Sequence, residues 1–302
     1  MRVVVTGADG HLAYFVVREL SEEHAIECWI RPGEITQCNR FARLDKPGVT
    51  YRKVDLADPD AVSHSLVGVD AIVHLAYAHE PGHYREGHGN DLAGWYRSNL
   101  AMQINLVLAA HTQRVQRFIL MSSRAAYGSA ASCLSEGAAI WPDSHYGALK
   151  AASEMLLAAF DDMRHCAIRS TGVYGCVEPL ESSKWFDLLL TLKRSRVLAK
   201  DRVGTEVHGQ DLARVVTQVL MSEATWPPVV NVSDLIVSHA MIADVFSRQT
   251  GCDVDIRQRL HQTSGVMTCD WLAAAGFKFG GLPLFEETLE RLVDTCRQDG
   301  SP

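Results

Sequence analysis

Tyr146 and Lys150 have the residue types and the spacing that allow proton transfer. On a helix, side chains four positions apart lie side by side, so the Tyr146 phenol would lie beside the Lys150 ammonium group. A free phenol has a pKa of about 10, and an adjacent cation favours the phenolate. Such pairs also occur on solvated helix faces, so this pair alone is a weak signal. It gains weight because a Ser122-Ser123 pair and a glycine-rich turn at Gly7 accompany it.

A regular alternation of strands and helices would position these residues. Apolar, β-branched runs predict strands over residues 1–6, 25–30, 49–54, 71–75, 117–121 and 166–169. Helical periodicity predicts helices over residues 12–20, 61–66, 92–111 and 144–160. Such alternation indicates a parallel sheet covered on both faces. After residue 173 the pattern loosens into helices over 185–192 and 207–221, a strand over 229–232, and mixed short elements.

The segment Gly7-Ala8-Asp9-Gly10-His11-Leu12-Ala13 connects the first predicted strand to the first predicted helix. Glycines there allow a tight turn and let backbone N–H groups approach a pyrophosphate at the helix N-terminus. A purely structural turn is the alternative interpretation. We expect Gly7, Asp9, Gly10, His11 and Leu12 to bind a dinucleotide.

The predicted fold class is therefore α/β, with a Rossmann-type doubly wound parallel sheet and a smaller mixed C-terminal substrate lobe. Residues 1–172 are expected to form the NAD(P)-binding domain, completed by about 206–234. Residues 173–205 and 235–302 are expected to form the substrate-binding lobe, placed over the carboxyl edge of the sheet.

Arg31 follows the second strand, where one side chain selects between the two nicotinamide dinucleotides. An acidic residue there would bind the ribose 2′-hydroxyl of NAD, whereas a nearby arginine accommodates the 2′-phosphate of NADP. A surface arginine without this role is the alternative. We expect NADP as the cofactor, with NAD as the alternative.

The composition limits location and partners. A net charge of −7 disfavours polyanionic partners such as nucleic acid, and no apolar run is long enough to span a membrane. The eight cysteines include no C-x-x-C pair, and the N-terminus has no signal-peptide pattern. We expect reduced thiols and a cytoplasmic protein.

One segment matches the sequence motif of zinc proteases but not the helix that the motif requires. His79-Glu80-Pro81-Gly82-His83 matches H-E-x-x-H, but Pro81-Gly82 would break the helix that such a zinc site requires. We expect no metal site, and we expect residues 77–90 to form a loop over the active site.

Several further motifs occur in a characteristic order, and with them the chain resembles the extended short-chain dehydrogenases/reductases, also called the NAD-dependent epimerase/dehydratase family. They are Asp55-Leu56, His74-Leu75-Ala76, Asn99, Ser122 to Gly128, Tyr146 with Lys150, Val173-Tyr174-Gly175, and His208 to Ala213. The resemblance covers nearly the whole chain. It implies that Asp55, Leu56, Leu75 and Ala76 also contact the cofactor, and that the enzyme is a homodimer.

The resemblance also implies the catalytic roles. Tyr146 would be the general acid or base at a carbinol or carbonyl oxygen, and Ser123 would hydrogen-bond the same oxygen. Lys150 would lower the pKa of Tyr146 and hold the nicotinamide ribose. Asn99 would support Lys150, through water, or would be an ordinary polar residue of its helix.

Two departures from the family pattern bear on the substrate. Dehydratases of this family carry an Asp-Glu pair after the catalytic Ser or Thr, but here Arg124-Ala125-Ala126 follows Ser123, which argues against dehydration. Gly204 stands where many members have an arginine that grips a diphosphate. The candidate substrate contacts are Arg124, Tyr174, Arg196 and Arg202.

We thus expect an NAD(P)-dependent oxidoreductase that transfers a hydride between NADP(H) and a small-molecule carbonyl or secondary alcohol. The alternative is an NAD-dependent nucleotide-sugar epimerase. A non-catalytic dinucleotide sensor is a third hypothesis, and the intact Ser123, Tyr146 and Lys150 argue against it.

Overall fold

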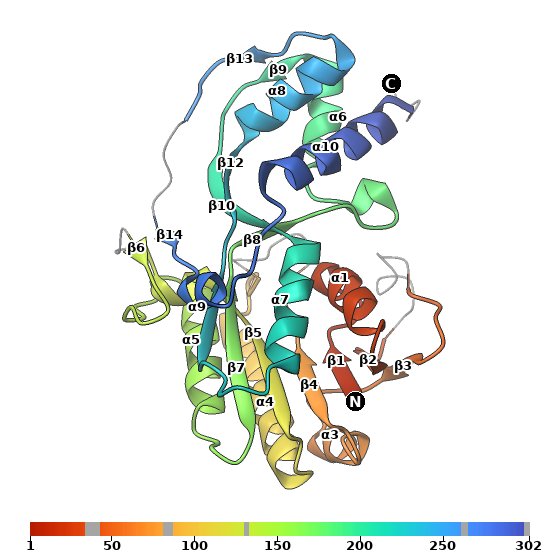
Figure 1. The fold of residues 1–302 in the computed structure, drawn as a ribbon, viewed down its shortest axis with the longest axis vertical. Helices are drawn as coiled ribbons and strands as arrows, with labels where there is room; N and C mark the ends of the chain where they lie inside the picture. The colour runs from red at the N-terminus through yellow and green to blue at the C-terminus, as the bar shows by residue number, and fades with distance from the viewer. Residues whose placement is uncertain (34–42, 81–86, 130–132, 261–264, 299–302) are drawn as a thin grey trace.

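A seven-stranded parallel sheet forms the centre of the computed structural model, which describes residues 1–33, 43–80, 87–129, 133–260 and 265–298 (Figure 1). The strand order is β11-β7-β5-β4-β1-β2-β3. The strands are β1 (Arg2–Thr6), β2 (Ala25–Ile30), β3 (Val49–Lys53), β4 (Ala71–His74), β5 (Arg117–Ser123), β7 (Arg164–Ser170) and β11 (Val229–Val232). The chain first builds outward from β1 to β3 and then returns to place β4 on the other side of β1. The carboxyl ends of β1 and β4 therefore form the switch point at which such sheets bind ligands.

Helices cover both faces of this sheet. On one face α1 (His11–Leu20) lies beside α7 (Gly209–Met221) (Figure 1). On the other face lie α3 (Pro59–Ser65), α4 (Leu92–Thr112) and α5 (His145–Leu157). In α7 the buried residues Leu212, Val215, Val216 and Val219 follow the helical period and join the core on the α1 side. The predicted α/β, Rossmann-type fold is confirmed.

A smaller lobe lies above the carboxyl edge of the sheet. Its three-stranded sheet has the order β12-β10-β8, with β8 (Gly172–Tyr174), β10 (Val203–His208) and β12 (Leu235–Ser238). Strand β8 follows the central strand β7 after one residue, so the lobe begins where the sheet ends. Its core is formed with α6 (Phe186–Ser195), α8 (His239–Thr250) and α10 (Gly281–Gln298) (Figure 1).

Short elements complete the described chain. They are the 3₁₀ turns η1 (Arg124–Tyr127) and η2 (Leu180–Ser182), helix α9 (Asp270–Ala274), and the pairs β9 (Val197–Leu198) with β13 (Asp255–Ile256) and β6 (Cys133–Leu134) with β14 (Val266–Met267). None of the helices that the structure describes has the length and apolar character needed to cross a membrane.

Two details differ from the sequence-based expectations. The predicted helix over 207–221 begins at Gly209, because Val207 and His208 belong to β10 and the His208 ring accepts the Gln210 N–H as a helix cap (3.1 Å). Part of the segment assigned to the lobe joins the main core instead. Leu272 is buried there, and Trp271, Phe277 and Phe279 pack against it.

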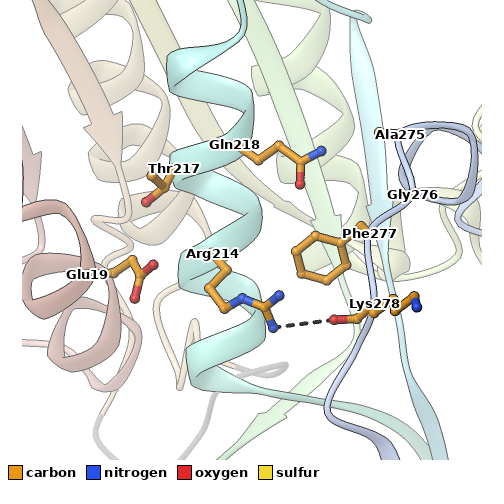
Figure 2. Close-up of a pocket in the computed structure, with 8 residues that line it drawn as sticks. All are labelled: Glu19, Arg214, Thr217, Gln218, Ala275, Gly276, Phe277 and Lys278. Atoms are coloured by element: carbon orange, nitrogen blue, oxygen red, sulfur yellow. Dashed lines mark hydrogen bonds between the residues drawn. The ribbon is translucent and has the colours of Figure 1, made fainter.

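The segment after α9 also borders a cavity of about 480 Å³ on the side of the sheet that α1 and α7 cover. Figure 2 shows Arg214, Thr217 and Gln218 of α7 on one side and residues 275–278 on the other. The Arg214 guanidinium crosses this space to the carbonyl oxygen of Lys278 (3.3 Å) and also binds Asp211 (2.8 Å). The cavity thus lies where α7 meets the segment that follows α9.

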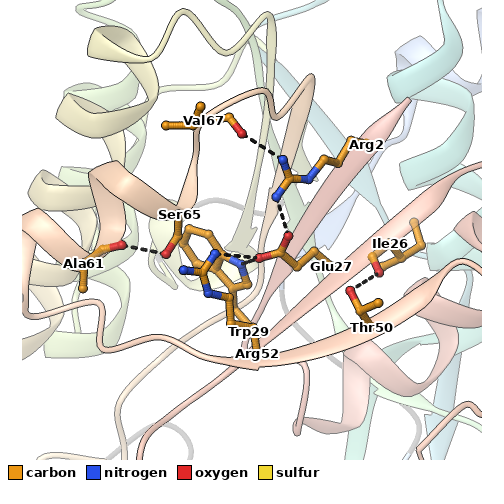
Figure 3. A network of polar contacts seen from close by, with 9 residues as sticks. All are labelled: Arg2, Ile26, Glu27, Trp29, Thr50, Arg52, Ala61, Ser65 and Val67. Atoms are coloured by element: carbon orange, nitrogen blue, oxygen red, sulfur yellow. Dashed lines mark hydrogen bonds and ion pairs between the residues drawn. The ribbon is translucent and has the colours of Figure 1, made fainter.

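A polar network at the outer strands shows how the sheet tolerates a charge in its interior (Figure 3). The Glu27 carboxylate accepts hydrogen bonds from Arg2 (2.6 Å), from the Trp29 ring (2.9 Å) and from Arg52 (3.5 Å). Burial raises the pKa of Glu27, but the hydrogen bonds from Arg2 and Trp29 and the charges of Arg2 and Arg52 outweigh it, so the pKa is lowered. The carboxylate therefore favours folding in its charged form.

This network predicts a pH-dependent contribution to stability. Glu27→Gln should lower the free energy of unfolding by about 1 kcal/mol at pH 7, a small value because Arg2 and Arg52 are partly exposed. Because the folded-state pKa is lowered, the contribution is complete above the ordinary pKa of about 4.3 and is lost as the pH falls through the folded value. Urea unfolding at pH 7 and pH 3 measures this difference.

The matched control is Glu22→Gln. Glu22 forms an ion pair with Lys46 and its side chain is 72% exposed, so its loss should change stability little at either pH. A Glu27→Gln effect that stayed constant down to pH 3 would contradict the role assigned to the carboxylate.

Candidate active site

The β1–α1 turn lies at the switch point of the sheet and is shaped by a close backbone approach. Gly7 has φ +66°, and a Cβ added there would lie 2.7 Å from the Cα of Ala76, which follows β4. The N–H of Gly10 donates to the Gly7 carbonyl (3.0 Å) and closes the turn. Only glycine fits position 7, because another residue would meet main chain.

Helix α1 starts directly after this turn and has no side-chain cap. Gly10 is the N-cap residue, and it has no side chain that could cap the first N–H groups of the helix. Asp9, His11 and Leu12 are half-buried around this helix end. Uncapped N–H groups and the helix dipole favour a negatively charged group. The turn therefore fits the pyrophosphate of a dinucleotide.

The ends of the neighbouring strands supply further predicted cofactor contacts. Arg31 is exposed immediately after β2. Asp55 is exposed after β3 and accepts the Ala57 N–H (2.9 Å), whereas the Leu56 side chain is buried in the core. Leu75 and Ala76 are half-buried after β4. The structure thus brings these predicted positions to one edge of the sheet.

Beneath this edge, Thr6 and His74 connect β1 to β4. The Thr6 hydroxyl lies 2.7 Å from Nδ1 of His74 and accepts the Ala76 N–H (3.3 Å). Burial, and next the positive charge of Lys150, lower the pKa of His74 to about 3. His74 is thus a neutral ring at physiological pH. The sequence showed it only as one letter of a motif, and its contact with Thr6 was missed.

The predicted catalytic pair lies on α5. Ser144 caps this helix by accepting the Gly147 N–H (3.1 Å), and Tyr146 is half-buried in the first turn. Lys150, one turn later, is 8% exposed and donates to the carbonyl oxygen of Met121 (2.8 Å). Burial lowers the pKa of Lys150 to about 8, although the Glu154 charge acts in the opposite direction. Lys150 is therefore mostly protonated at pH 7.

Gly147 and Tyr77 bring the predicted catalytic groups together. Ser123, half-buried at the end of β5, accepts the Ala125 N–H (3.2 Å) and so begins turn η1. A Cβ added at Gly147 would collide with the carbonyl oxygen of Ala125, so glycine lets α5 approach this turn. The Tyr77 ring lies 5.2 Å from the Tyr146 ring and 5.4 Å from the Lys150 ammonium group. The importance of Gly147 and Tyr77 was not predicted, although Gly147 adjoins the tyrosine in the sequence.

The Asn99 side chain is held by main-chain atoms. It is 6% exposed, and its side-chain amide donates to the carbonyl oxygens of Ala78 and Trp95 (both 3.0 Å) and accepts the Ala78 N–H (2.9 Å). These bonds hold the chain after β4 against α4. They involve main-chain atoms of Ala78 and Trp95, not Lys150.

The predicted substrate residues do not form one cluster. Arg124 donates to the carbonyl oxygen of Gly265 (3.2 Å), and Arg202 is exposed before β10. Arg196 caps the end of α6 at φ 57° and lies over the Phe246 ring, 5.5 Å away. Tyr174 is wholly buried in the lobe core against Trp185 and Phe285. Burial of Tyr174 and the contact of Arg196 indicate packing within the lobe.

Other features lie away from the catalytic pair or beyond the described chain. The cavity between α7 and residues 275–278 includes none of the predicted site residues. The predicted loop over 77–90 and the H-E-x-x-H letters fall partly on residues 81–86, which lie outside the described residues.

A glycine turn at the switch point of a Rossmann-type sheet, with a Tyr–Lys pair beside it, defines a dinucleotide-dependent enzyme. A model of the NAD dependent epimerase/dehydratase family matches residues 3–233, and the chain belongs to this family. The resemblance inferred from the sequence is thereby confirmed.

Individual relatives are more distant. A trifunctional UDP-glucose 4,6-dehydratase/UDP-4-keto-6-deoxy-D-glucose 3,5-epimerase/UDP-4-keto-L-rhamnose-reductase of Arabidopsis thaliana is 26% identical over 186 residues. The match covers 57% of this chain but only 27% of the plant protein.

Solved structures share the fold over almost the whole chain. The UDP-N-acetylglucosamine 4-epimerase of Methanobrevibacter ruminantium has a TM-score of 0.78 and 22% identity, and 97% of each chain is covered. The UDP-glucose 4-epimerase of Thermus thermophilus, solved with NAD, has a TM-score of 0.73 and 21% identity, covering 99% of this chain and 100% of the other. At these identities the likeness shows the fold alone.

The close approach at Gly7 predicts a loss of dinucleotide binding in Gly7→Ala. The added methyl group would overlap the main chain at Ala76, so the turn must shift and the N–H groups of α1 must move with it. Affinity for NADH and NADPH should fall at least tenfold, equivalent to about 1.4 kcal/mol. Titration of nucleotide fluorescence measures it.

Gly251→Ala is the matched control. Gly251 ends α8 with nearly the same φ, +67°, but nothing lies within 4 Å of an added Cβ. It should cost only the left-handed backbone strain of about 1–2 kcal/mol in stability, with dinucleotide affinity unchanged. Normal binding by Gly7→Ala would refute the placement of the cofactor at this turn.

Proposed function

We propose that this enzyme moves a hydride between a nicotinamide dinucleotide and a carbinol carbon of a nucleotide-linked sugar, acting as an epimerase. The observation that carries this proposal is the anchored Lys150. Its ammonium group is held on the Met121 carbonyl, two residues before Ser123 and one helical turn from Tyr146. The site thus has a hydroxyl, a phenol and a fixed cation beside the predicted cofactor turn.

In this reaction each of the three side chains would have its own role. Tyr146 would take the proton from the sugar hydroxyl as the carbon loses its hydride, and would return it when the carbon regains the hydride on its opposite face. Ser123 hydrogen-bonds the same oxygen, and the Lys150 charge favours the phenolate. A bound nicotinamide dinucleotide supplies the hydride acceptor and donor. The lobe built from α6, α8 and α10 would hold the rest of the substrate.

Family membership and the comparisons support a sugar substrate. The family model describes epimerases and dehydratases, and the two similar solved structures are UDP-sugar 4-epimerases. Dehydration is disfavoured because Arg124 and Ala125 follow Ser123, where dehydratases of this family have an acid pair. Epimerisation needs only the groups that Tyr146, Ser123 and Lys150 provide.

A second candidate is an NADP-dependent reductase of an unlinked carbonyl compound. Arg31 favours it, because an exposed guanidinium after β2 suits a 2′-phosphate and stands in place of an acidic residue. Gly204 favours it as well, since that position on β10 offers no cation to a diphosphate.

We also infer that the enzyme forms a homodimer through α4 and α5. These helices are neighbours on one face of the sheet, and Ile104, Leu108 and Met155 expose 41%, 50% and 68% of their surface there. Exposed apolar side chains on adjacent helices suit a helical interface.

The epimerase proposal predicts turnover of a UDP-hexose and its loss in Tyr146→Phe. The wild type, supplied with NAD, should interconvert UDP-glucose and UDP-galactose or their N-acetylamino counterparts, followed by NMR of the sugar. Tyr146→Phe removes only the hydroxyl, so turnover should fall about 10²–10⁴-fold while NADH binding is retained.

Tyr96→Phe is the control for this substitution. The Tyr96 hydroxyl contacts the His145 ring (3.1 Å), next to Tyr146 in the sequence. The proposed mechanism gives the Tyr96 hydroxyl no role in proton transfer. Its removal should leave turnover within about a factor of two to three. If every UDP-hexose stays unconverted and UDP does not raise the melting temperature, the reductase candidate replaces the epimerase.

Arg31 predicts the cofactor preference. If its guanidinium binds the 2′-phosphate, NADPH should bind more tightly than NADH by about 1.5–3 kcal/mol, and Arg31→Ala should remove most of this difference. Arg164→Ala is the control, because Arg164 begins β7 at the opposite edge of the sheet. Fluorescence titration decides the matter, and tighter binding of NADH by the wild type would eliminate the NADP assignment.

A further inference from the structure

A buried ion pair lies next to the catalytic helix and strand. Glu154 of α5 and Arg169 of β7 are 8% and 4% exposed. The Arg169 Nε lies 3.0 Å from one Glu154 carboxylate oxygen, and its Nη2 lies 2.6 Å from the other. The pair therefore has a bidentate geometry that fixes the carboxylate.

Strand β5 holds the same carboxylate from a third side. The Ser122 hydroxyl, 2% exposed, donates to Oε1 of Glu154. Ser122 is paired in register with Arg169, so both partners of Glu154 lie at the same level of neighbouring strands. The orientation of Glu154 is thus determined by α5, β5 and β7 together.

This carboxylate and the Lys150 ammonium group belong to neighbouring turns of one helix. Lys150 and Glu154 are four residues apart on α5, which places their side chains on the same face. Lys150 binds the carbonyl oxygen of Met121 and Glu154 binds the hydroxyl of Ser122, so the two charges meet consecutive residues of β5. Both charges are therefore buried where α5 packs against β5.

Stability alone is a weak reason for such a pair. Buried ion pairs are often no better than apolar side chains of equal volume, because both charges lose their hydration. The arrangement is more easily explained by a role for the Glu154 charge.

We propose that Glu154, held by Arg169 and Ser122, is a positioning residue that supplies the counter-charge for Lys150 and keeps it an ammonium ion. This inference rests on the proposed function only in so far as the Lys150 charge is used in turnover. The claim about charge can be measured without substrate or cofactor.

Among the residues that the structure describes, Glu154 is the carboxylate whose charge acts on Lys150. Strand β4 contributes His74, which is neutral, to the surroundings of Lys150. The segment after β4 contributes the Tyr77 ring. From α5 itself come Tyr146 and Glu154. Arg169 of β7 is the other cation of this region, and its charge is engaged by Glu154. Burial lowers the pKa of Lys150, and the Glu154 charge limits this fall.

The test is the titration of the Lys150 amine in the full chain, observed by NMR of ¹⁵N-labelled lysine and assigned with Lys150→Arg. Glu154→Gln keeps the size and a hydrogen-bond acceptor but removes the charge. The pKa of Lys150 should then fall by about one unit or more below that of the wild type, whereas Glu154→Asp should stay close to the wild type.

Asp201→Asn is the matched control. Asp201 is a buried carboxylate of the lobe, 1% exposed, that accepts N–H groups from Arg202, Ala240 and Leu260. Its loss should lower the melting temperature without moving the Lys150 titration. A purely structural Glu154 would behave in the same way.

If Glu154→Gln does not fold, Glu154→Gln/Arg169→Met takes its place, because removing both charges leaves no unpaired ion. A lowered Lys150 pKa in either variant supports the proposal, and an unchanged titration overturns it. Tyr146→Phe tests the proposed function separately, since its outcome does not affect this titration.

Discussion

Lys150 carries the charge on which the proposed catalytic arrangement depends. An ammonium group with 8% exposure has lost most of its water, and a cation in that position needs fixed oxygen atoms around it. The Met121 carbonyl provides one such atom at 2.8 Å, and this bond joins α5 to β5. Because Tyr146 precedes Lys150 on the helix and Ser123 follows Met121 on the strand, the same bond sets where the phenol and the hydroxyl meet.

Two close approaches of the main chain bring the cofactor turn and the catalytic helix to this point. Gly7 lies against Ala76, after β4, and Gly147 lies against Ala125, after β5. A side chain at either glycine would separate the elements that the site requires. The Thr6–His74 contact joins the two regions from below, and His74 stays neutral because it is buried near the Lys150 charge. The two halves of the site are thus coupled through β4.

Much of this arrangement could be predicted from the sequence, because the features that form it are encoded by short, continuous segments. Buried parallel strands are continuous apolar runs, and the glycine turn and the Tyr146–Lys150 spacing are short motifs, so each is readable within a few residues. The lobe strands β8, β10 and β12 were missed, and β8 has only three residues. In β10 the sequence Val203-Gly204-Thr205-Glu206-Val207-His208 has little apolar character. Tyr174 and Asn99 depend on distant partners, Trp185 with Phe285 and the backbone of Ala78, which no local pattern reveals.

The question of a linked or an unlinked sugar comes down to one face of β10. Gly204 and Glu206 lie on the same face, because side chains alternate along a strand. Glu206 forms an ion pair with Lys184 and approaches Gly172 of β8, so a carboxylate and its paired ammonium group occupy the place beside the missing arginine. A diphosphate bound there would approach the Glu206 charge, and it would gain Lys184 only by replacing Glu206 as its partner. A substrate without phosphates faces no such exchange, since its hydroxyl groups can bond to the ion pair as it stands. If the substrate meets this face of β10, a sugar linked to a diphosphate would require the Lys184–Glu206 pair to open, whereas an unlinked sugar would not.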